Sequence, residues 1–386
     1  MYISLLLLAL VFIIFLIDFV PQFTIWQSRI YIGRILDNGL WIEKVKNKCV
    51  SWLDKTPTIK LTGQTRLVFI DILRGNYKRT AIQDWQQAAL VLGIYQYFKV
   101  TNDANAKAKI TTFLATKINS NGSWKKNPTE IDGVILAYAF LNCDFIDHNY
   151  NKPSYDFMYS LILNLKGLDG TIAYRSHSKN YRFVDTIGFI CPFLIAYGTK
   201  FNNQEAVNLG IVQIAEFNKY ALYTNSNLPC HTYLETTKKP VGLFGWGRGL
   251  GWYAIGLIDA WNGLPNSHLQ KENLTLNVIQ FTKTILDHQN SDGSWSWLVT
   301  QPDARNDSST TATLAWFLAN AATIATIENQ CTTAKDKAMQ YLKTVTQRNG
   351  AIDFSQGDTK GIAIHSLEFT ILPFTQGFCL RTFYAN

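Results

Sequence analysis

Apolar residues are most concentrated at the very start of the chain. Residues 3–17 are apolar apart from Ser4, and the run resumes after Asp18. Its length is near the lower limit of about 17–25 residues for a helix that crosses a bilayer. It lacks an amphipathic polar face, a basic segment before it and a small-residue cleavage site after it, which argues against a buried core helix and a cleaved signal peptide. We therefore predict a transmembrane anchor at residues 1–21 and a juxtamembrane linker or helix at 22–61.

The charges beside this run bear on which side of the membrane the rest of the chain occupies. Arg29, Arg34, Lys44, Lys46 and Lys48 follow the run, whereas only the amino terminus precedes it. Because basic residues beside an anchor tend to stay in the cytoplasm, the asymmetry favours a cytoplasmic body on a bacterial inner membrane. A single short apolar run can also act as an export signal, so the opposite side stays open at this point.

From about residue 62 onward, apolar runs of helical length alternate with short turns rich in Gly, Asn, Asp and Pro. Strand-like alternation is scarce. The candidate helices are Thr65–Leu73, Trp85–Lys99, Asn105–Ile118, Glu130–Leu141, Ser154–Leu165, Val184–Gly198, Gln204–Tyr220, Arg248–Trp261, Leu274–His288, Thr310–Thr326, Thr333–Thr346 and Ile364–Phe378. Twelve helices over roughly 310 residues give about 26 residues per helix and loop, a natural size for a helix–turn–helix repeat.

The turns between these runs also recur. Asn121-Gly122, Asp169-Gly170, Asp292-Gly293 and Asn349-Gly350 each follow one helical run and precede another. Asn-Gly and Asp-Gly suit tight turns because both residues tolerate positive φ. A closed ring of six helical hairpins accounts for both the helix count and the repeated turn. We therefore predict an all-α fold, an (α/α)6 toroid, for residues 62–386.

Polar and aromatic residues stand at the starts of alternate predicted helices. They are Trp85 with Gln86, Asp132, Asp185, Arg248, Ser309 with Thr310, and Ser366 beside His365. In a toroid whose inner helices run parallel, these starts converge on one mouth, where helix N-termini favour anionic groups. Helix capping is the alternative for each Asp or Ser, but it does not account for the Trp and Arg in the same set. We therefore predict one pocket that suits an acidic sugar.

Composition and charge narrow the class of partner. The net charge is +8 and 13% of the residues are aromatic, which favours an anionic ligand and is compatible with a sugar-binding surface. No run of Lys and Arg exceeds two residues, which argues against a nucleic-acid partner. The six cysteines lie far apart and form no CxxC pair, so we expect no metal site.

The most specific local string is GWGRGLGWY at residues 245–253. Its glycines allow a ligand to approach the backbone closely, and Arg248 carries a fork suited to a carboxylate. The string resembles the WGRGNGWY loop of the unsaturated glucuronyl and rhamnogalacturonyl hydrolases, glycoside hydrolase families 88 and 105. Further segments resemble motifs of these families in the same order, at residues 84–88, 97–103, 131–132, 183–194, 231–233, 292–295 and 307–312.

The resemblance implies an (α/α)6 barrel that removes a terminal 4,5-unsaturated uronic acid by hydrating its C4=C5 bond, with no metal or organic cofactor. It implies that Asp185 protonates C4 and then helps water to add at C5. We expect a second carboxylate, Asp132, assisted by burial, to raise the pKa of Asp185. The expected substrate contacts are His231 and Arg248 for the carboxylate and hydroxyl groups, Trp85, Trp246 and Trp252 for stacking, and Gln86.

The chain departs from the family pattern at three of these positions. Leu250 stands where the families have Asn, Leu234 where they have Asp, and Phe189 where Met is common. These differences leave room for a second function, a membrane-anchored, non-catalytic carbohydrate-binding toroid within surface-polysaccharide assembly. Another (α/α)6 enzyme, such as a sugar epimerase or lyase, fits less well because it needs a His or Tyr pair as bases and the chain has only six His.

Overall fold

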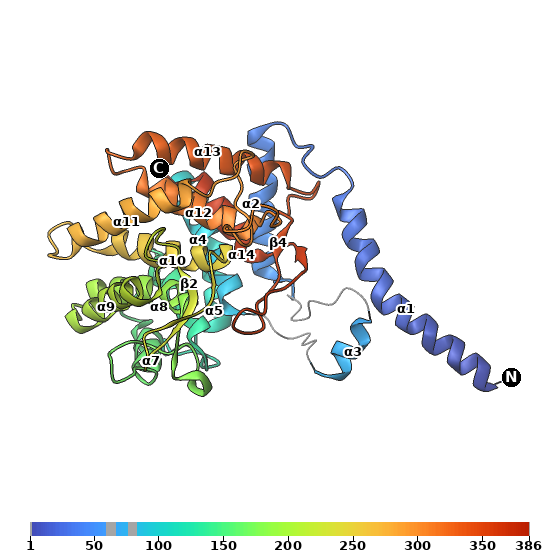
Figure 1. Ribbon diagram of the computed structural model, residues 1–386, viewed down its shortest axis with the longest axis horizontal. Coiled ribbons are helices and arrows are strands. Elements are labelled where there is room, and N and C mark those ends of the chain that lie inside the picture. Colours follow the sequence, from blue (N-terminus) through green and yellow to red (C-terminus); the bar gives the residue numbers. More distant parts are fainter. Residues whose placement is uncertain (1, 59–66, 76–82, 386) are drawn as a thin grey trace.

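Two concentric rings of helices make up the body of the protein. The computed structural model describes residues 2–58, 67–75 and 83–385. Six helices form the inner ring, in which each packs against the next and the last packs against the first (Figure 1). They are α4 (Asp84–Thr101), α6 (Val134–Leu141), α8 (Val184–Lys200), α10 (Gly247–Gly263), α12 (Ser308–Ala321) and α14 (Pro373–Phe383).

The outer ring covers the inner one. Its helices are α2 (Asn38–Asp54), α5 (Ala104–Lys117), α7 (Lys152–Leu163), α9 (Gln204–Ala221), α11 (Lys271–Leu286) and α13 (Glu328–Thr344). Residue pattern separates the two rings, because an inner helix is enclosed on all sides and an outer one only on one face. Every residue of α12 except Asn320 is buried, whereas the buried residues of α13 recur at helical spacing along one side. The predicted (α/α)6 toroid is confirmed.

The repeated Asn-Gly and Asp-Gly dipeptides form the same turn four times. Gly122, Gly170, Gly293 and Gly350 all have φ between 78° and 89°. In each turn the preceding Asn or Asp side chain accepts a hydrogen bond from the backbone N–H two residues later. At Gly293 a Cβ atom would also lie 2.3 Å from the carbonyl oxygen of Lys337, so the outer-helix packing requires glycine there. These turns were predicted from local sequence.

Short strands, which the sequence did not indicate, lie at one end of the barrel. The strands β1 (Tyr181–Phe183), β2 (Cys230–Leu234) and β3 (Pro240–Phe244) form an antiparallel sheet in that order. The strands β4 (Ser355–Gln356) and β5 (Phe369–Thr370) pair as a second antiparallel unit. Because β1 runs directly into α8, and because β3 and β5 precede α10 and α14 closely, both units lie at the N-terminal ends of inner helices.

The expected juxtamembrane segment at residues 22–61 is instead divided between an extended first helix and the barrel. The helix α1 (Tyr2–Arg29) continues to Arg29, and α2 packs on α4, α5 and α14 as the first helix of the ring. The buried residues of α2 are Trp41, Ile42, Val45, Cys49, Trp52 and Leu53. An outer barrel helix and a helix lying on a membrane surface both have apolar residues at this helical spacing. The sequence therefore did not distinguish between these two positions for α2.

The helix expected at Thr65–Leu73 is not part of the ring. Its first residues, 65 and 66, lie outside the described ranges, and the short α3 (Val68–Leu73) contacts α1 instead. The backbone N–H of Val68 donates to Asp18 Oδ1 at 2.9 Å. Outside the barrel, α1 points away from both rings, and each of its residues is exposed or half-buried (Figure 1). It is the one described helix that is long and apolar enough to cross a membrane.

The last inner helix starts later than predicted. The expected helix ran from Ile364 to Phe378, but α14 begins at Pro373. Leu372 adopts φ −142° and ψ 123°, the extended conformation that a following proline favours, and proline is well suited to the first helical turn. The chain before it therefore remains a hairpin, and its residues become available to the mouth of the barrel.

Candidate active site

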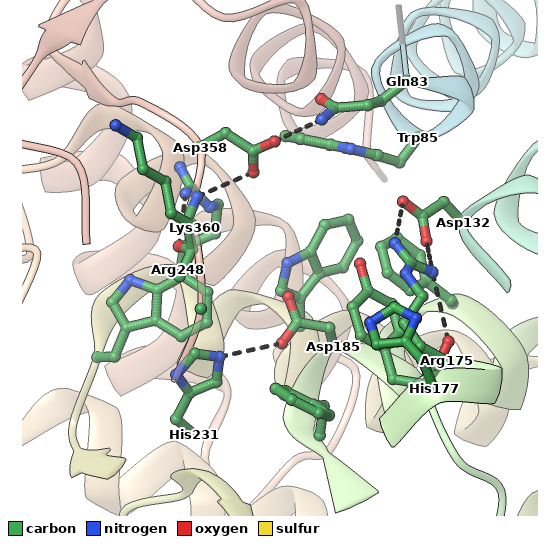
Figure 2. A pocket seen from close by; sticks show the side chains of 17 residues that line it. Gln83, Trp85, Asp132, Arg175, His177, Asp185, His231, Arg248, Asp358 and Lys360 are labelled. Carbon is green, nitrogen blue, oxygen red and sulfur yellow. Dashed lines mark hydrogen bonds and ion pairs between the residues drawn. The ribbon is translucent and has the colours of Figure 1, made fainter. Parts of the chain in front are cut away.

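A cavity of about 340 Å³ opens at the end of the barrel where the inner helices begin. Figure 2 shows side chains converging on it from several helix starts and from the β4–β5 hairpin. Seven of the residues predicted from sequence line it together: Trp85, Asp132, Asp185, His231, Trp246, Arg248 and Trp252. Four of the six predicted helix starts, those at Trp85, Asp132, Asp185 and Arg248, therefore meet at one mouth.

Gln86 does not line this cavity. It is 1% exposed, and its Oε1 accepts a hydrogen bond from the backbone N–H of Phe374 at 2.8 Å. Successive residues of an α-helix point about 100° apart, so with Trp85 facing the cavity Gln86 faces the neighbouring helix. It joins α4 to the first turn of α14, and its expected role in substrate binding is replaced by a structural one.

Ser309 and Thr310 also do not line the cavity. Their hydroxyls donate to the carboxylate of Asp307, the N-cap of α12, at 2.9 and 2.7 Å for Ser309 and 2.6 Å for Thr310. For these two residues the capping alternative holds. Ser366 lies in the β4–β5 hairpin, where its carbonyl oxygen accepts a hydrogen bond from Gln356 Nε2 at 3.1 Å.

Asp185 lies in the first turn of α8, with its carboxyl group at the floor of the cavity. Its side chain is 14% exposed, and its Oδ2 has no hydrogen-bond partner among the described residues. Burial raises the pKa of Asp185 to about 7, with smaller contributions from Asp132 and Asp358, while Arg248 acts in the opposite direction. In a large fraction of the molecules Asp185 is therefore protonated near neutral pH, as a proton donor requires.

Burial is therefore the main cause of the raised pKa of Asp185, whereas the sequence analysis gave that role to Asp132. Asp132, on the 3-10 turn Ile131–Gly133, forms a bidentate pair with Arg175 at 2.6 and 3.0 Å. Glu130 lies 3.4 Å from the same guanidinium, which also stacks on the ring of Tyr174 at 3.7 Å. Because Arg175 offsets much of the charge of Asp132, repulsion between the two aspartates is the weaker effect.

His231 faces Asp185 from β2. Its Nε2 lies 3.8 Å from Asp185 Oδ2, a contact too long for a direct hydrogen bond. Burial, followed by the charges of His365 and Arg248, lowers the pKa of His231 to about 3. The imidazole is therefore neutral near pH 7, and its contact with the carboxyl is not a contact between two charged groups.

Arg248 is tied to the protein more closely than the sequence suggested. It is 2% exposed and donates to the carbonyl oxygens of Gln356 and Gly357, the latter at 2.6 Å, and to Thr359 Oγ1 at 3.3 Å. A guanidinium has five N–H donors, so part of its capacity still faces the cavity. The guanidinium is therefore not a free fork for a carboxylate, because it also holds the β4–β5 hairpin against α10.

The three tryptophans form walls of the cavity. Trp85, Trp246 and Trp252 are 4%, 1% and 2% exposed. Trp85 meets Trp252 edge-to-face with ring centroids 5.6 Å apart, and Trp246 Nε1 donates to Gln356 Oε1 at 3.1 Å. Little of each ring is available to a sugar, so their main contribution is to exclude water from the floor around Asp185.

Besides Asp132 and Asp185, the cavity is lined by a third carboxyl group, Asp358, which the sequence analysis missed. Asp358, between β4 and β5, receives hydrogen bonds from Gln83 Nε2 and from the backbone N–H of Thr359, and burial raises its pKa (Figure 2). Lys360 lines the same side of the cavity. A glycine-flanked polar stretch, GDTKG at residues 357–361, was the available signal. It was overlooked because an apolar run beginning at Ile364 was interpreted as a helix start.

The position of Leu250 and the metal-binding capacity of the described side chains both bear on the site. Leu250, the most conspicuous departure from the family motif, is fully buried within α10 and does not line the cavity. Within the described ranges, no group of three or more His, Cys, Asp or Glu side chains is placed to hold a metal ion.

Comparisons with known proteins agree with the architecture. The model of Glycosyl Hydrolase Family 88 matches residues 59–369, whereas no curated protein matches the chain. A possible member of glycoside hydrolase family 105 from Salmonella enterica has a TM-score of 0.74 at 16% identity, covering 90% of this chain and 93% of its own. An unsaturated glucuronyl hydrolase from Bacillus sp. GL1, responsible for glycosaminoglycan degradation, has a TM-score of 0.66 at 14% identity, covering 92% and 95%. The extent of the family match, over most of the barrel, shows that the chain belongs to Glycosyl Hydrolase Family 88 and is a glycoside hydrolase.

Proposed function

We propose that this enzyme removes a terminal 4,5-unsaturated uronic acid from acidic oligosaccharides by hydrating the C4=C5 vinyl ether. The observation that carries the proposal is the state of Asp185, a largely buried carboxyl group at the cavity whose Oδ2 has no hydrogen-bond partner among the described residues and whose pKa is raised to about 7. Such a group donates a proton to C4, which leaves the positive charge shared between C5 and the ring oxygen. The resulting carboxylate then accepts a proton from the water that adds at C5. The hemiketal opens and releases the next sugar.

The charges around the cavity suit an acidic sugar. Arg175 and Lys360 line its walls, and the N-terminal ends of inner helices point towards it. Helix N-termini and basic side chains both favour an anion, so the uronate carboxylate has several positions in which it is stabilised. Asp132 and the neutral His231 supply acceptors for sugar hydroxyls.

The assay follows the double bond directly. The C4=C5 bond of an unsaturated disaccharide absorbs in the ultraviolet, and hydration removes this absorbance. We expect the wild-type enzyme to abolish the absorbance and Asp185→Asn to leave it. Asp156→Asn is a matched control, because Asp156 lies on the outer helix α7 in an exposed ion pair with Lys152. Saturable binding without any loss of absorbance by the wild type would instead support a non-catalytic carbohydrate-binding toroid.

We infer that α1 anchors the enzyme as a single-pass helix in a bacterial inner membrane. Arg29, at its C-terminal end, bonds to the barrel, a contact that removal of a signal peptide would break. The basic residues after α1 favour a cytoplasmic barrel. Intact mass of the mature protein and protease accessibility in spheroplasts test the two parts. A mature chain that lacks residues 2–29 would overturn the anchor, and a barrel digested from outside would overturn the cytoplasmic side.

A further inference from the structure

Arg29, the last residue of α1, reaches into the barrel. Its Nε and Nη2 donate to the two carboxylate oxygens of Asp353, each at 2.9 Å. Nη2 also donates to the carbonyl oxygen of Phe369 at 2.6 Å, and the guanidinium lies over the ring of Phe354, 4.4 Å from its centroid. One side chain of the apolar helix therefore makes a charged contact and a backbone contact with the barrel.

Arg29 is the direct ion-pair partner of Asp353, while Arg305 acts on the same carboxylate from beyond ion-pair distance. The side chain of Asp353 is 1% exposed. Gln347 Nε2 and the backbone N–H of Phe354 also donate to it, at 2.8 and 2.6 Å, but neither group is charged. Within the described ranges, Arg29 is the only basic side chain that forms an ion pair with Asp353. Because a buried carboxylate without a direct ion-pair partner is costly, we expect loss of Arg29 to disturb the backbone around Asp353, unless Arg305 moves in to replace it.

The two groups that Arg29 holds are the two ends of the β4–β5 hairpin. Asp353 lies two residues before β4, and Phe369 is the first residue of β5. Between the strands, residues 358–361 line the active-site cavity. A single guanidinium thus bonds to both sides of the hairpin at its base, in addition to the pairing of β4 with β5, while the other end of the hairpin lines the cavity.

The same hairpin is bonded to the floor of the cavity. Arg248 donates to the carbonyl oxygens of Gln356 and Gly357, and Trp246 Nε1 donates to Gln356 Oε1. A shift at the base of the hairpin therefore reaches residues on α10 that lie beside Asp185.

We propose that Arg29 is a positioning residue for the active site, which holds the β4–β5 hairpin, and with it Asp358 and Lys360, in the geometry that binds the substrate. The apolar helix is then a component of the substrate-binding architecture as well as an anchor. The kinetic part of this proposal rests on the proposed function, whereas its structural part does not.

Amide hydrogen exchange of the full-length protein in detergent micelles tests the structural part without any substrate. We expect Arg29→Ala to increase exchange in residues 353–370, and Arg29→Lys to have an intermediate effect because lysine keeps the charge but loses the fork. Arg34→Ala is the matched control, because Arg34 lies in the loop between α1 and α2 and stacks on the ring of Tyr31, 4.9 Å from its centroid. Unchanged exchange at residues 353–370 in Arg29→Ala overturns the proposal.

Steady-state kinetics on an unsaturated disaccharide test the kinetic part. A displaced hairpin misplaces substrate contacts, so we expect Arg29→Ala to reduce kcat/KM by about 10- to 100-fold, mainly through KM. A merely structural residue would lower the active fraction, and hence kcat, at unchanged KM, and that result overturns the positioning role. If the wild type itself gives no turnover while exchange still responds to Arg29→Ala, the proposed function fails and the structural coupling stands.

Discussion

The two ends of the barrel have cavities of nearly equal size, and each contains an aspartate. The two aspartates differ in whether the carboxyl group has a charged partner. The cavity at the inner-helix N-termini has a volume of about 340 Å³ and contains Asp185, whose Oδ2 lacks a partner among the described residues. The cavity at the C-terminal ends has a volume of about 350 Å³ and contains Asp259. Asp259 accepts hydrogen bonds from Arg381 at 2.7 Å and from Trp316 at 2.8 Å.

The difference shows how one fold uses buried aspartates for two purposes. Helix C-termini favour cations, so Arg381 near the end of α14 is well placed to pair with Asp259 and close that end of the barrel. At the other end the imidazole of His231 is neutral and lies 3.8 Å from Asp185. A satisfied carboxylate stabilises the fold, whereas an unsatisfied carboxyl with a raised pKa is available for chemistry.

The largest expected effect is on turnover at the mouth. Asp185→Asn removes the proton donor while keeping the shape of the side chain, so we expect kcat to fall by about 10²- to 10⁴-fold. The free energy of unfolding should stay unchanged or rise at neutral pH, because a buried ionisable group is removed. Ultraviolet turnover assays and urea denaturation measure the two quantities. Full turnover by this variant would remove Asp185 from the mechanism.

The opposite result is expected at the far end. Asp259→Ala leaves the guanidinium of Arg381 buried without a counter-ion, which costs about 3–5 kcal/mol of stability. The kcat/KM of the folded fraction should not change, because Asp259 and Asp185 belong to different cavities. Replacing both partners, as Asp259→Leu with Arg381→Met, should restore most of the loss. A selective change in KM would show that the two ends are coupled.

The pH dependence sharpens the contrast further. Turnover requires protonated Asp185, so kcat/KM should fall as pH rises through about 7. The unfolded chain releases this proton near pH 3.9, so between about pH 4 and 7 the native state holds one proton more. The contribution of Asp185 to stability is therefore lost as pH rises through that window. Asp185→Asn should remove this slope from denaturation curves measured at a series of pH values; an unchanged slope would place the titration elsewhere.

The smallest effect is expected for a substitution at Leu250, which lies in α10 and does not line the active-site cavity. Leu250 is fully buried in α10. The Asn that stands at this position in the family motif would therefore be buried there, with no hydrogen-bond partner provided for its amide group. We expect Leu250→Asn to cost about 1–3 kcal/mol of stability and to leave KM unchanged. Thermal denaturation and steady-state kinetics on the same preparation are sufficient. A decreased KM would show that residue 250 contacts the substrate after all.

Much of the site was accessible from local sequence. The Gly-rich string around Arg248 and the polar starts of alternate helices predicted six of the residues that line the cavity, and the family resemblance added His231. Gln86 was misplaced because spacing along the chain locates a helix start but does not give the direction of each side chain. Asp358 was missed because its position depends on a hairpin held by Arg29, Arg248 and Gln83, all distant in sequence.

By itself the sequence determined the elements whose signals are local: the apolar first helix, the period of the barrel helices and the four repeated turns at glycines such as Gly293. Only the tertiary structure decided that α2 closes the ring, that Arg248 binds a hairpin as well as facing the cavity, and that burial outweighs Asp132 in raising the pKa of Asp185. The reason is physical. Helical period and turn conformation are properties of neighbouring residues, whereas burial, charge pairing and side-chain direction arise from contacts between segments far apart in the chain.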